Sequence, residues 1–347
     1  MEAALAHNAG WRLPLLGLMA LMAGGLALAG LALGPVEIPP GRVIATLMGQ
    51  GTPVETAIIW QIRLPRILLG VAVGTALALS GASLQGLLRN PLADPGLIGV
   101  TGGASLGAVA VIVLGGLVAG SLPAWLLPWL LPLAAFLGAG IVITFVFALA
   151  RSAGETSVAT LILAGVAVNA IAGAAIGAMV YISTDDQLRD LTFWTMGALG
   201  GSGWSLVAAA SLLTFATAPV LFRQSRALDL FQLGERAAFH AGLDVEGVKR
   251  QIAIATALAV GAVTAAAGPI GFIGLVAPHL ARLALGPRHV VLLPASVLLG
   301  ICLVLAADLA VRLAVPPAEP PIGLATSLIG GPFFLWLLIR TRGRTHA

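Results

Sequence analysis

Hydrophobic residues run along this chain in long blocks separated by short polar stretches. A hydrocarbon core about 30 Å thick needs roughly 20 apolar residues for each helical span, and blocks of that length recur along nearly the whole sequence. We therefore expect about ten spans, near residues 13–34, 64–88, 96–119, 124–150, 156–182, 204–222, 251–267, 270–285, 290–311 and 322–339.

The length and composition of the blocks predict helices. They are rich in Leu, Ala and Gly and about twice as long as the strands of a membrane barrel. The block 251–285 would reach about 50 Å as one helix, too long for one span, and Gly268-Pro269 supplies a break. With 59% hydrophobic and 9% charged residues, we expect an all-α polytopic membrane protein forming one transmembrane domain over 1–347.

The distribution of positive charge predicts an orientation in the bilayer. Of the 18 Lys and Arg residues, five fall on the loops of one side, which leaves 13 for the other. Because positive residues concentrate on cytoplasmic loops, both termini are expected inside. The basic character is then an effect of topology and predicts no nucleic-acid binding. The five on the outer side are Arg42, Arg63, Arg66, Arg189 and Arg312.

Three of these outer arginines have two possible explanations. Arg63 and Arg66 lie in "WQIRLPRILLG", and Arg312 lies in "LAADLAVRLAV". Their side chains could reach the membrane interface or pair locally, as Asp308 and Arg312 could at i, i+4 spacing. Alternatively, they form a basic cluster that receives an acidic partner. The residues alone leave both possibilities open.

Few residues could supply chemistry. The five histidines fall in no HExxH spacing and Cys302 is the single cysteine, so we expect no metal site. The single lysine, Lys249, lies in "GVKRQ" and not in a phosphate-binding loop, so a separate subunit would have to bind ATP. Asp308 is the main acidic candidate within a span, and this scarcity argues against an ion-coupled secondary transporter. We expect no catalytic residue in this chain.

Three polar stretches interrupt the apolar pattern. The cytoplasmic loop 223–250 predicts two short helices broken near Gly234 and Gly242, either as an interfacial connector or as a coupling element for another protein. "LLRNPLADPGLIGVTGGASLG" (87–107) and "GPIGFIGLVAPHLAR" (268–282) are broken segments. They fit either a transport pathway or ordinary tight turns.

Five stretches between about Trp60 and Leu338 carry a resemblance to known proteins. They are "RLPRILLGVAVGTALALSGASLQGLLRNPLADPGLIGV", "FWTMGALGG", "LGERAAFHAGL", "GPIGFIGLVAPHLAR" and "PPIGLATSLIGGPFFLWLL". Together they resemble one family, the FecCD-type permeases of ABC importers for ferric siderophores, heme and vitamin B12. Within that family, "STDDQLRDLTFWTMGALGG" most resembles the heme permeases.

The resemblance implies a type II importer fold in the bacterial inner membrane. It implies a homodimer, two cytoplasmic ATPase subunits that bind Mg–ATP, and a substrate-binding protein outside, with no cofactor in this chain. Heme is the expected substrate, and a ferric siderophore or vitamin B12 is the alternative within the family. An ion-coupled secondary transporter and a non-transporting assembly protein are the rival classes.

The resemblance also assigns site residues. Pro320 in "AEPPIG" stands where a leucine is more usual and leaves the geometry near the outer mouth open. Asn90 has a second interpretation as a helix cap. The residues implied are Arg63, Arg66 and Arg312 for docking of the binding protein; Leu233, Gly234, Glu235, Ala238, Gly242 and Leu243 for coupling to the ATPase; and Asn90, Pro91 and Leu92 for the cytoplasmic gate.

Overall fold

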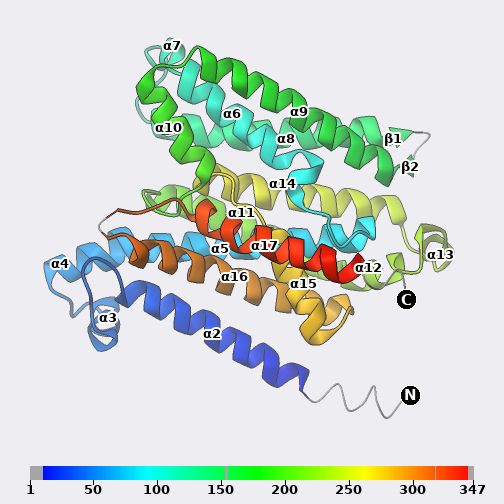
Figure 1. Cartoon of the computed structure of the whole chain (residues 1–347), viewed down its shortest axis with the longest axis horizontal. Coiled ribbons are helices and arrows are strands. Elements are labelled where there is room, and N and C mark those ends of the chain that lie inside the picture. Colours follow the sequence, from blue (N-terminus) through cyan, green and yellow to red (C-terminus); the bar gives the residue numbers. More distant parts are fainter. Residues whose placement is uncertain (1–10, 153–154, 317, 343–347) are drawn as a thin grey trace.

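The computed structural model describes residues 11–152, 155–316 and 318–342 as a bundle of helices (Figure 1). Within these residues, seven helices are long and apolar enough to cross a membrane, and three further apolar helices are shorter. The prediction of about ten helical spans is confirmed. The long helices are α2 (Arg12–Ala32), α5 (Leu64–Leu88, continuous with the helical segment from Pro53), α8 (Leu127–Ala150), α9 (Val158–Tyr181), α11 (Trp204–Arg223), α14 (Val245–Ala267) and α16 (His289–Ala314). The shorter apolar ones are α6 (Val100–Leu114), α15 (Ile273–Leu285) and the stretch Ile322–Phe333 of α17 (Ile322–Arg342).

Short elements complete the described chain at the ends of the bundle. Two of them, α12 and α13, are the pair of helices expected in the loop 223–250, with Gly234 between them and Gly242 after the second. The short elements are α3 (Pro40–Leu47), α4 (Pro53–Thr56), the π-helix η1 (Ala57–Arg63), the 3-10 helix η2 (Pro95–Ile98), α7 (Gly116–Ala119), the hairpin β1 (Arg151–Ser152) and β2 (Glu155–Thr156), α10 (Asp185–Met196), α12 (Ser225–Phe231) and α13 (Glu235–His240).

Several boundaries differ from the hydropathy pattern. The second span begins at Pro53 and not at 64, since Thr52 and Glu55 form a capping box that starts the helix earlier. The block 96–119 is divided into η2, α6 and α7, because Gly99 adopts a left-handed conformation between η2 and α6. The expected break at Gly268-Pro269 is confirmed, with α14 ending at Ala267 and α15 beginning at Ile273.

Close approach between backbones holds the centre of the bundle together. The helix α5 packs against α11, α14, α15 and α16, and nearly all of its residues are buried. A Cβ atom on Gly81 would lie 2.0 Å from the carbonyl oxygen of Gly274 in α15. One on Gly74 would lie 2.6 Å from the backbone nitrogen of Ile301 in α16. Glycine is therefore required where α5 touches these two neighbours.

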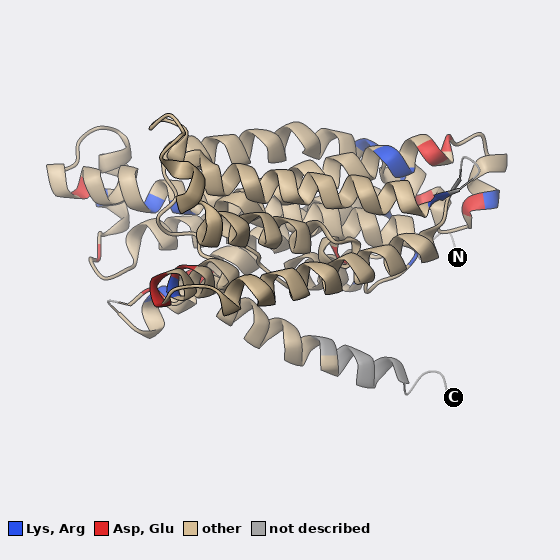
Figure 2. Cartoon of the chain, turned by 90° about the horizontal axis from the view of Figure 1, so that it is seen from above, with Lys and Arg blue, Asp and Glu red and all other residues tan. Residues whose placement is uncertain are grey.

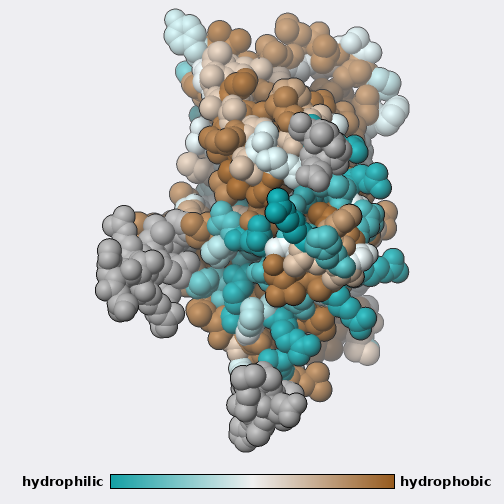
Figure 3. Space-filling model, turned by 90° about the vertical axis from the view of Figure 1, so that its right-hand side faces the viewer, coloured by the Kyte–Doolittle hydropathy of each residue, from teal (hydrophilic) through white to brown (hydrophobic). Residues whose placement is uncertain are grey.

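Charged residues gather toward the two ends of the bundle and leave its middle largely uncharged (Figure 2). One end carries α3 and α4, and the opposite end carries the β1–β2 hairpin and α13 (Figure 1). Hydrophilic residues cluster on the second end (Figure 3). This distribution fits a helix bundle whose uncharged middle lies in hydrocarbon. Both chain termini, which the charge distribution predicts to be inside, lie outside the described residues, as does Arg344, one of the 13 basic residues expected on that side.

The close contact between α5 and α15 predicts a position where one methyl group is harmful. Gly81→Ala should lower the free energy of unfolding by about 1–3 kcal/mol or more, because the carbonyl that the methyl meets belongs to the backbone and cannot rotate away. Thermal unfolding of the purified protein in detergent measures the change. Gly24→Ala in α2 is the matched control, since nothing lies within 4 Å of its added Cβ atom. Equal melting temperatures for the two variants would contradict this packing.

Candidate functional site

The first candidate site is an arginine cluster at the end of the bundle that carries α3 and α4. It consists of Arg63, Arg66, Asp308, Arg312 and Glu319, which come from η1, α5, α16 and the segment before α17. All three arginines are buried, at 4–5% exposure. Glu319 is the accessible member, with 45% of its side chain exposed.

Two of these arginines hold the end of α2. Arg63 Nη1 donates to the carbonyl oxygens of Leu31 at 2.6 Å and Ala32 at 3.0 Å. Arg312 Nη2 donates to the carbonyl oxygen of Gly30 at 3.0 Å. The last carbonyls of a helix lack intrahelical partners and carry partial negative charge, so cations are favourable there. These contacts join α2 to η1 and α16.

Asp308 balances the charge at the centre of the cluster. Its carboxylate accepts from Arg66 Nε at 2.9 and 3.2 Å, and Arg312 Nε lies 3.3 Å from Oδ2. Arg66 Nη1 also donates to Glu319 Oε2 at 2.5 Å. The predicted i, i+4 pairing of Asp308 with Arg312 is confirmed. Three arginines and two carboxylates leave the cluster with a formal charge of +1.

The second candidate site is the predicted gate, where the two broken segments meet. Pro91 and Leu92 line a small cavity together with residues of α15 and with Phe333 of α17. Asn90 Oδ1 accepts from the backbone nitrogen of Leu92 at 2.9 Å and so stabilises a turn. The residue that caps the next helix, η2, is Asp94, whose Oδ1 accepts from the backbone nitrogen of Gly96 at 2.8 Å. The helix-cap interpretation of Asn90 is therefore wrong.

A glutamine joins the second broken segment to the end of α5. Gln85, near the end of α5, donates through Nε2 to the carbonyl oxygen of Gly274 at 3.2 Å. Its Oε1 accepts from Arg282 Nη2 at 3.2 Å. Residues 87–107 follow directly after the turn of α5 that carries Gln85, and Pro91 and Leu92 line one cavity with residues of α15, so the two segments lie side by side. The sequence singled out both segments but gave no sign that Gln85 joins the second one to α5.

The third candidate site is the pair α12 and α13. The helix α12 is anchored on the bundle, because Gln232 Nε2 donates to the carbonyl oxygen of Gly86 at 3.1 Å and Asp229 Oδ1 lies 2.7 Å from His289 Nδ1. Leu228 and Phe231 of α12 are fully buried.

Around α13, the apolar side chains face in two directions. Ala238 is buried against the bundle, whereas Leu233 and Phe239 are largely exposed. Glu235, Phe239 and Leu243 line a groove of about 570 Å³. Exposed apolar residues beside a groove are typical of a protein-interaction surface. Gly234 and Gly242, at the two ends of α13, both have positive φ angles that favour glycine.

Side chains able to hold a metal ion do not gather anywhere in the described ranges. Among residues 11–152, 155–316 and 318–342, no group of three or more His, Cys, Asp or Glu side chains is placed to bind one. Cys302 is buried in α16. The described sites therefore consist of charge clusters, turns and apolar grooves.

Comparison with known proteins places the chain in a family. Residues 11–340 match the FecCD transport family. The chain belongs to the FecCD transport family. It is 48% identical over 285 residues to the hemin transport system permease protein HmuU of Yersinia pestis, and the alignment covers 82% of this chain and 84% of that relative. It is 44% identical over 320 residues to the vitamin B12 import system permease protein BtuC of Klebsiella pneumoniae, and that alignment covers 91% of each chain.

A solved structure agrees with the FecCD fold. It is described as an inward-facing conformation of a metal-chelate type ABC transporter and is 30% identical, with a TM-score of 0.83. The alignment covers 94% of this chain and 99% of the solved one. This FecCD protein is thus a multi-span membrane permease subunit of an ABC importer, and the predicted resemblance, including the likeness to heme permeases, is confirmed.

The arginine cluster predicts a strong dependence of stability on Asp308. Asp308→Asn would leave Arg66 and Arg312 buried without their shared carboxylate. Removing one partner of a buried ion pair costs about 3–5 kcal/mol, so the melting temperature in detergent should fall clearly. Arg42→Gln is the control. It breaks the ion pair between Glu55 and the exposed Arg42 and should change stability little, because exposed ion pairs contribute little. Similar melting temperatures for both variants would show that the buried network does not stabilise the fold.

Proposed function

We propose that this FecCD protein is the permease subunit of a heme importer. In this proposal two copies form a central pathway in a bacterial inner membrane, with both termini in the cytoplasm. Alternating access is driven by two cytoplasmic ATPase subunits, which bind Mg–ATP. The observation that carries the choice of heme is the 48% identity to a hemin permease, against 44% to a vitamin B12 permease.

Vitamin B12 is the second candidate substrate. The vitamin B12 relative aligns over a larger share of this chain, 91% against 82%. A ferric siderophore is the third candidate. The likeness to a solved metal-chelate type transporter supports it, because a ferric siderophore is a metal chelate. Heme and metal chelates are all bulky ligands, so a permissive pathway could accept more than one of them. The binding protein would then select among them.

Docking of the binding protein is proposed at the arginine cluster, through Arg63, Arg66 and Arg312. The support is the cluster's net positive charge together with its position at one end of the bundle. Because Asp308 and backbone carbonyls already occupy the three guanidinium groups, acidic residues of the partner would approach where Glu319 is exposed. Attraction of this kind mainly raises the association rate and weakens with salt.

Coupling to the ATPase is proposed at the opposite end, through Leu233, Gly234, Glu235, Ala238, Gly242 and Leu243. The support is that α13 exposes apolar side chains while α12 is bonded to α5 and α16. Movement of α12 and α13 would therefore be transmitted to the central helices α5 and α16. Asn90, Pro91 and Leu92 would form the cytoplasmic gate. The support is that Pro91 and Leu92 line a cavity with residues of α15 and α17, and that Asn90 stabilises their turn.

The choice of substrate predicts which load activates the transporter. The permease and its ATPase are reconstituted in liposomes, and ATP hydrolysis is measured with a binding protein carrying hemin, cobalamin or a ferric siderophore. Hemin should stimulate hydrolysis more than the other two loads. Stimulation by cobalamin alone would replace heme by vitamin B12, and hydrolysis that responds to no load would contradict an importer driven by this ATPase.

The docking proposal predicts that Glu319 slows association. Glu319→Gln should raise the association rate of the binding protein at low salt, because the formal charge of the cluster rises from +1 to +2. The gain should disappear at high salt, and stopped-flow fluorescence measures both rates. Asp186→Asn on α10 removes the same charge outside the cluster and should have a smaller effect. Equal rates for Glu319→Gln and the unmodified protein at low salt would contradict docking at the cluster.

A further inference from the structure

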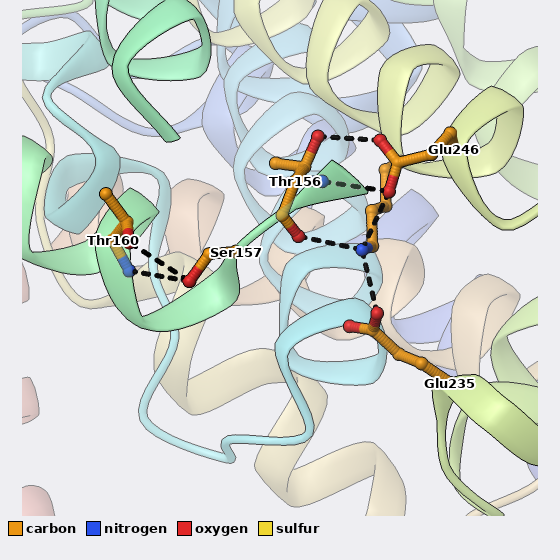
Figure 4. Close-up of polar contacts among 6 residues, drawn as sticks. Thr156, Ser157, Thr160, Glu235 and Glu246 are labelled. Carbon is orange, nitrogen blue, oxygen red and sulfur yellow. Dashed lines mark hydrogen bonds and ion pairs between the residues drawn. The ribbon is translucent and has the colours of Figure 1, made fainter. Parts of the chain in front are cut away.

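The single lysine of the chain connects three elements near α13. Lys249 lies in the second turn of α14 and is 3% exposed. Its Nζ donates to the carbonyl oxygen of Thr156 at 2.8 Å, to Glu235 Oε2 at 2.8 Å and to Glu246 Oε1 at 3.0 Å (Figure 4). An ammonium group has three protons to donate, so all of them are used. The three acceptors belong to β2, α13 and α14.

A second set of bonds makes β2 and α14 one unit. Glu246 Oε1 accepts from the backbone nitrogen of Thr156 at 3.1 Å, and Glu246 Oε2 accepts from Thr156 Oγ1 at 2.7 Å. The carbonyl oxygen of Thr156 is bound by Lys249. The backbone of β2 is therefore held by α14 through both its N–H and its C=O, and the hairpin joins α8 to α9.

The attachment of α13 to this unit is of a different kind. Glu235, the first residue of α13, has its carboxylate 2.8 Å from Lys249 Nζ, and a third of its side chain is exposed. Gly234 and Gly242 flank α13 with positive φ angles, so the connections at both ends are short and bend at a glycine. An ion pair between a buried lysine and a partly exposed glutamate thus links α13 to α14.

We propose that Lys249 is the positioning residue that transmits displacement of α13 to α14 and to the β1–β2 hairpin between α8 and α9. This rests on the proposed function, because the displacement would come from an ATPase docked on α13. The helix α14 (Val245–Ala267) continues from Lys249 to the break at Gly268, a distance of about 30 Å. Beyond the break, residues of α15 line a small cavity together with Pro91 and Leu92. Lys249 thus joins the coupling surface to the helix that leads to the gate.

The first experiment measures the connection without any ATPase. Spin labels are placed at Arg151→Cys on the hairpin and Arg236→Cys on α13, in the Cys302→Ser background, with the full chain in lipid nanodiscs. Pulsed electron resonance then gives the distribution of distances between α13 and the hairpin. The distribution should be narrow with Lys249 present and broader in Lys249→Met. Arg250→Met, which removes the neighbouring exposed cation, should keep it narrow.

The second experiment measures transmission in the assembled transporter. The quantity is the ratio of ATP hydrolysis with loaded binding protein to hydrolysis without it, which does not depend on the amount of folded protein. Lys249→Met should reduce this ratio by roughly threefold or more, and Arg250→Met should leave it unchanged. Adding Glu235→Ala to Lys249→Met should reduce it no further if Glu235 acts through Lys249.

A second variant keeps the test decisive if Lys249→Met fails to fold. Glu235→Ala lies on the partly exposed α13 and removes the same bond from the other side. A narrow distance distribution in both variants, or an unchanged ratio in both, would overturn the role of Lys249 while the unmodified complex remains stimulated. An unmodified complex that no load stimulates would overturn the proposed function, and transmission through Lys249 with it.

Discussion

The close packing of the α5 backbone against the backbones of α15 and α16 is the interaction on which the rest of the structure depends. Gly81 and Gly74 bring α5 against α15 and α16 with no space for a side chain. In lipid, the hydrophobic effect supplies no force between apolar helices, so such close contacts and a few polar bonds must hold the bundle. The same helix carries Arg66 near one end and Gln85 near the other, and both residues bond to the neighbours that the glycines admit. The packing of α5 therefore sets the geometry of both polar ends.

The two ends use charge in different ways. At the arginine cluster, buried guanidinium groups hold the end of α2 and surround one buried carboxylate, which is a rigid arrangement with one exposed acid at its edge. At the opposite end, a buried lysine is joined to a glutamate on a short helix flanked by glycines. The first arrangement suits the proposed docking of a binding protein. The second suits the proposed coupling to an ATPase, where α13 would follow the motion of another subunit.

The sequence predicted most of the architecture because hydropathy and length determine spans directly. Helices outside the apolar blocks, such as α3 and α10, were missed, since they give no signal in a hydropathy pattern. The Asp308–Arg312 pair could be predicted from i, i+4 spacing. The bonds of Arg66 to Glu319 and of Lys249 to Glu235 and Thr156 could not, because they join elements whose contact depends on tertiary packing. For the same reason, the sequence marked the two broken segments without predicting that Gln85 joins the second one to α5.

The central proposal is that this FecCD permease imports heme at the expense of ATP hydrolysed by a partner. The most direct measurement is accumulation of hemin inside proteoliposomes that contain the permease with its ATPase, with the binding protein outside. Hemin should accumulate only when ATP is inside and the binding protein is present. Accumulation that persists without ATP when an ion gradient is imposed would contradict the proposal and would point to a secondary transporter.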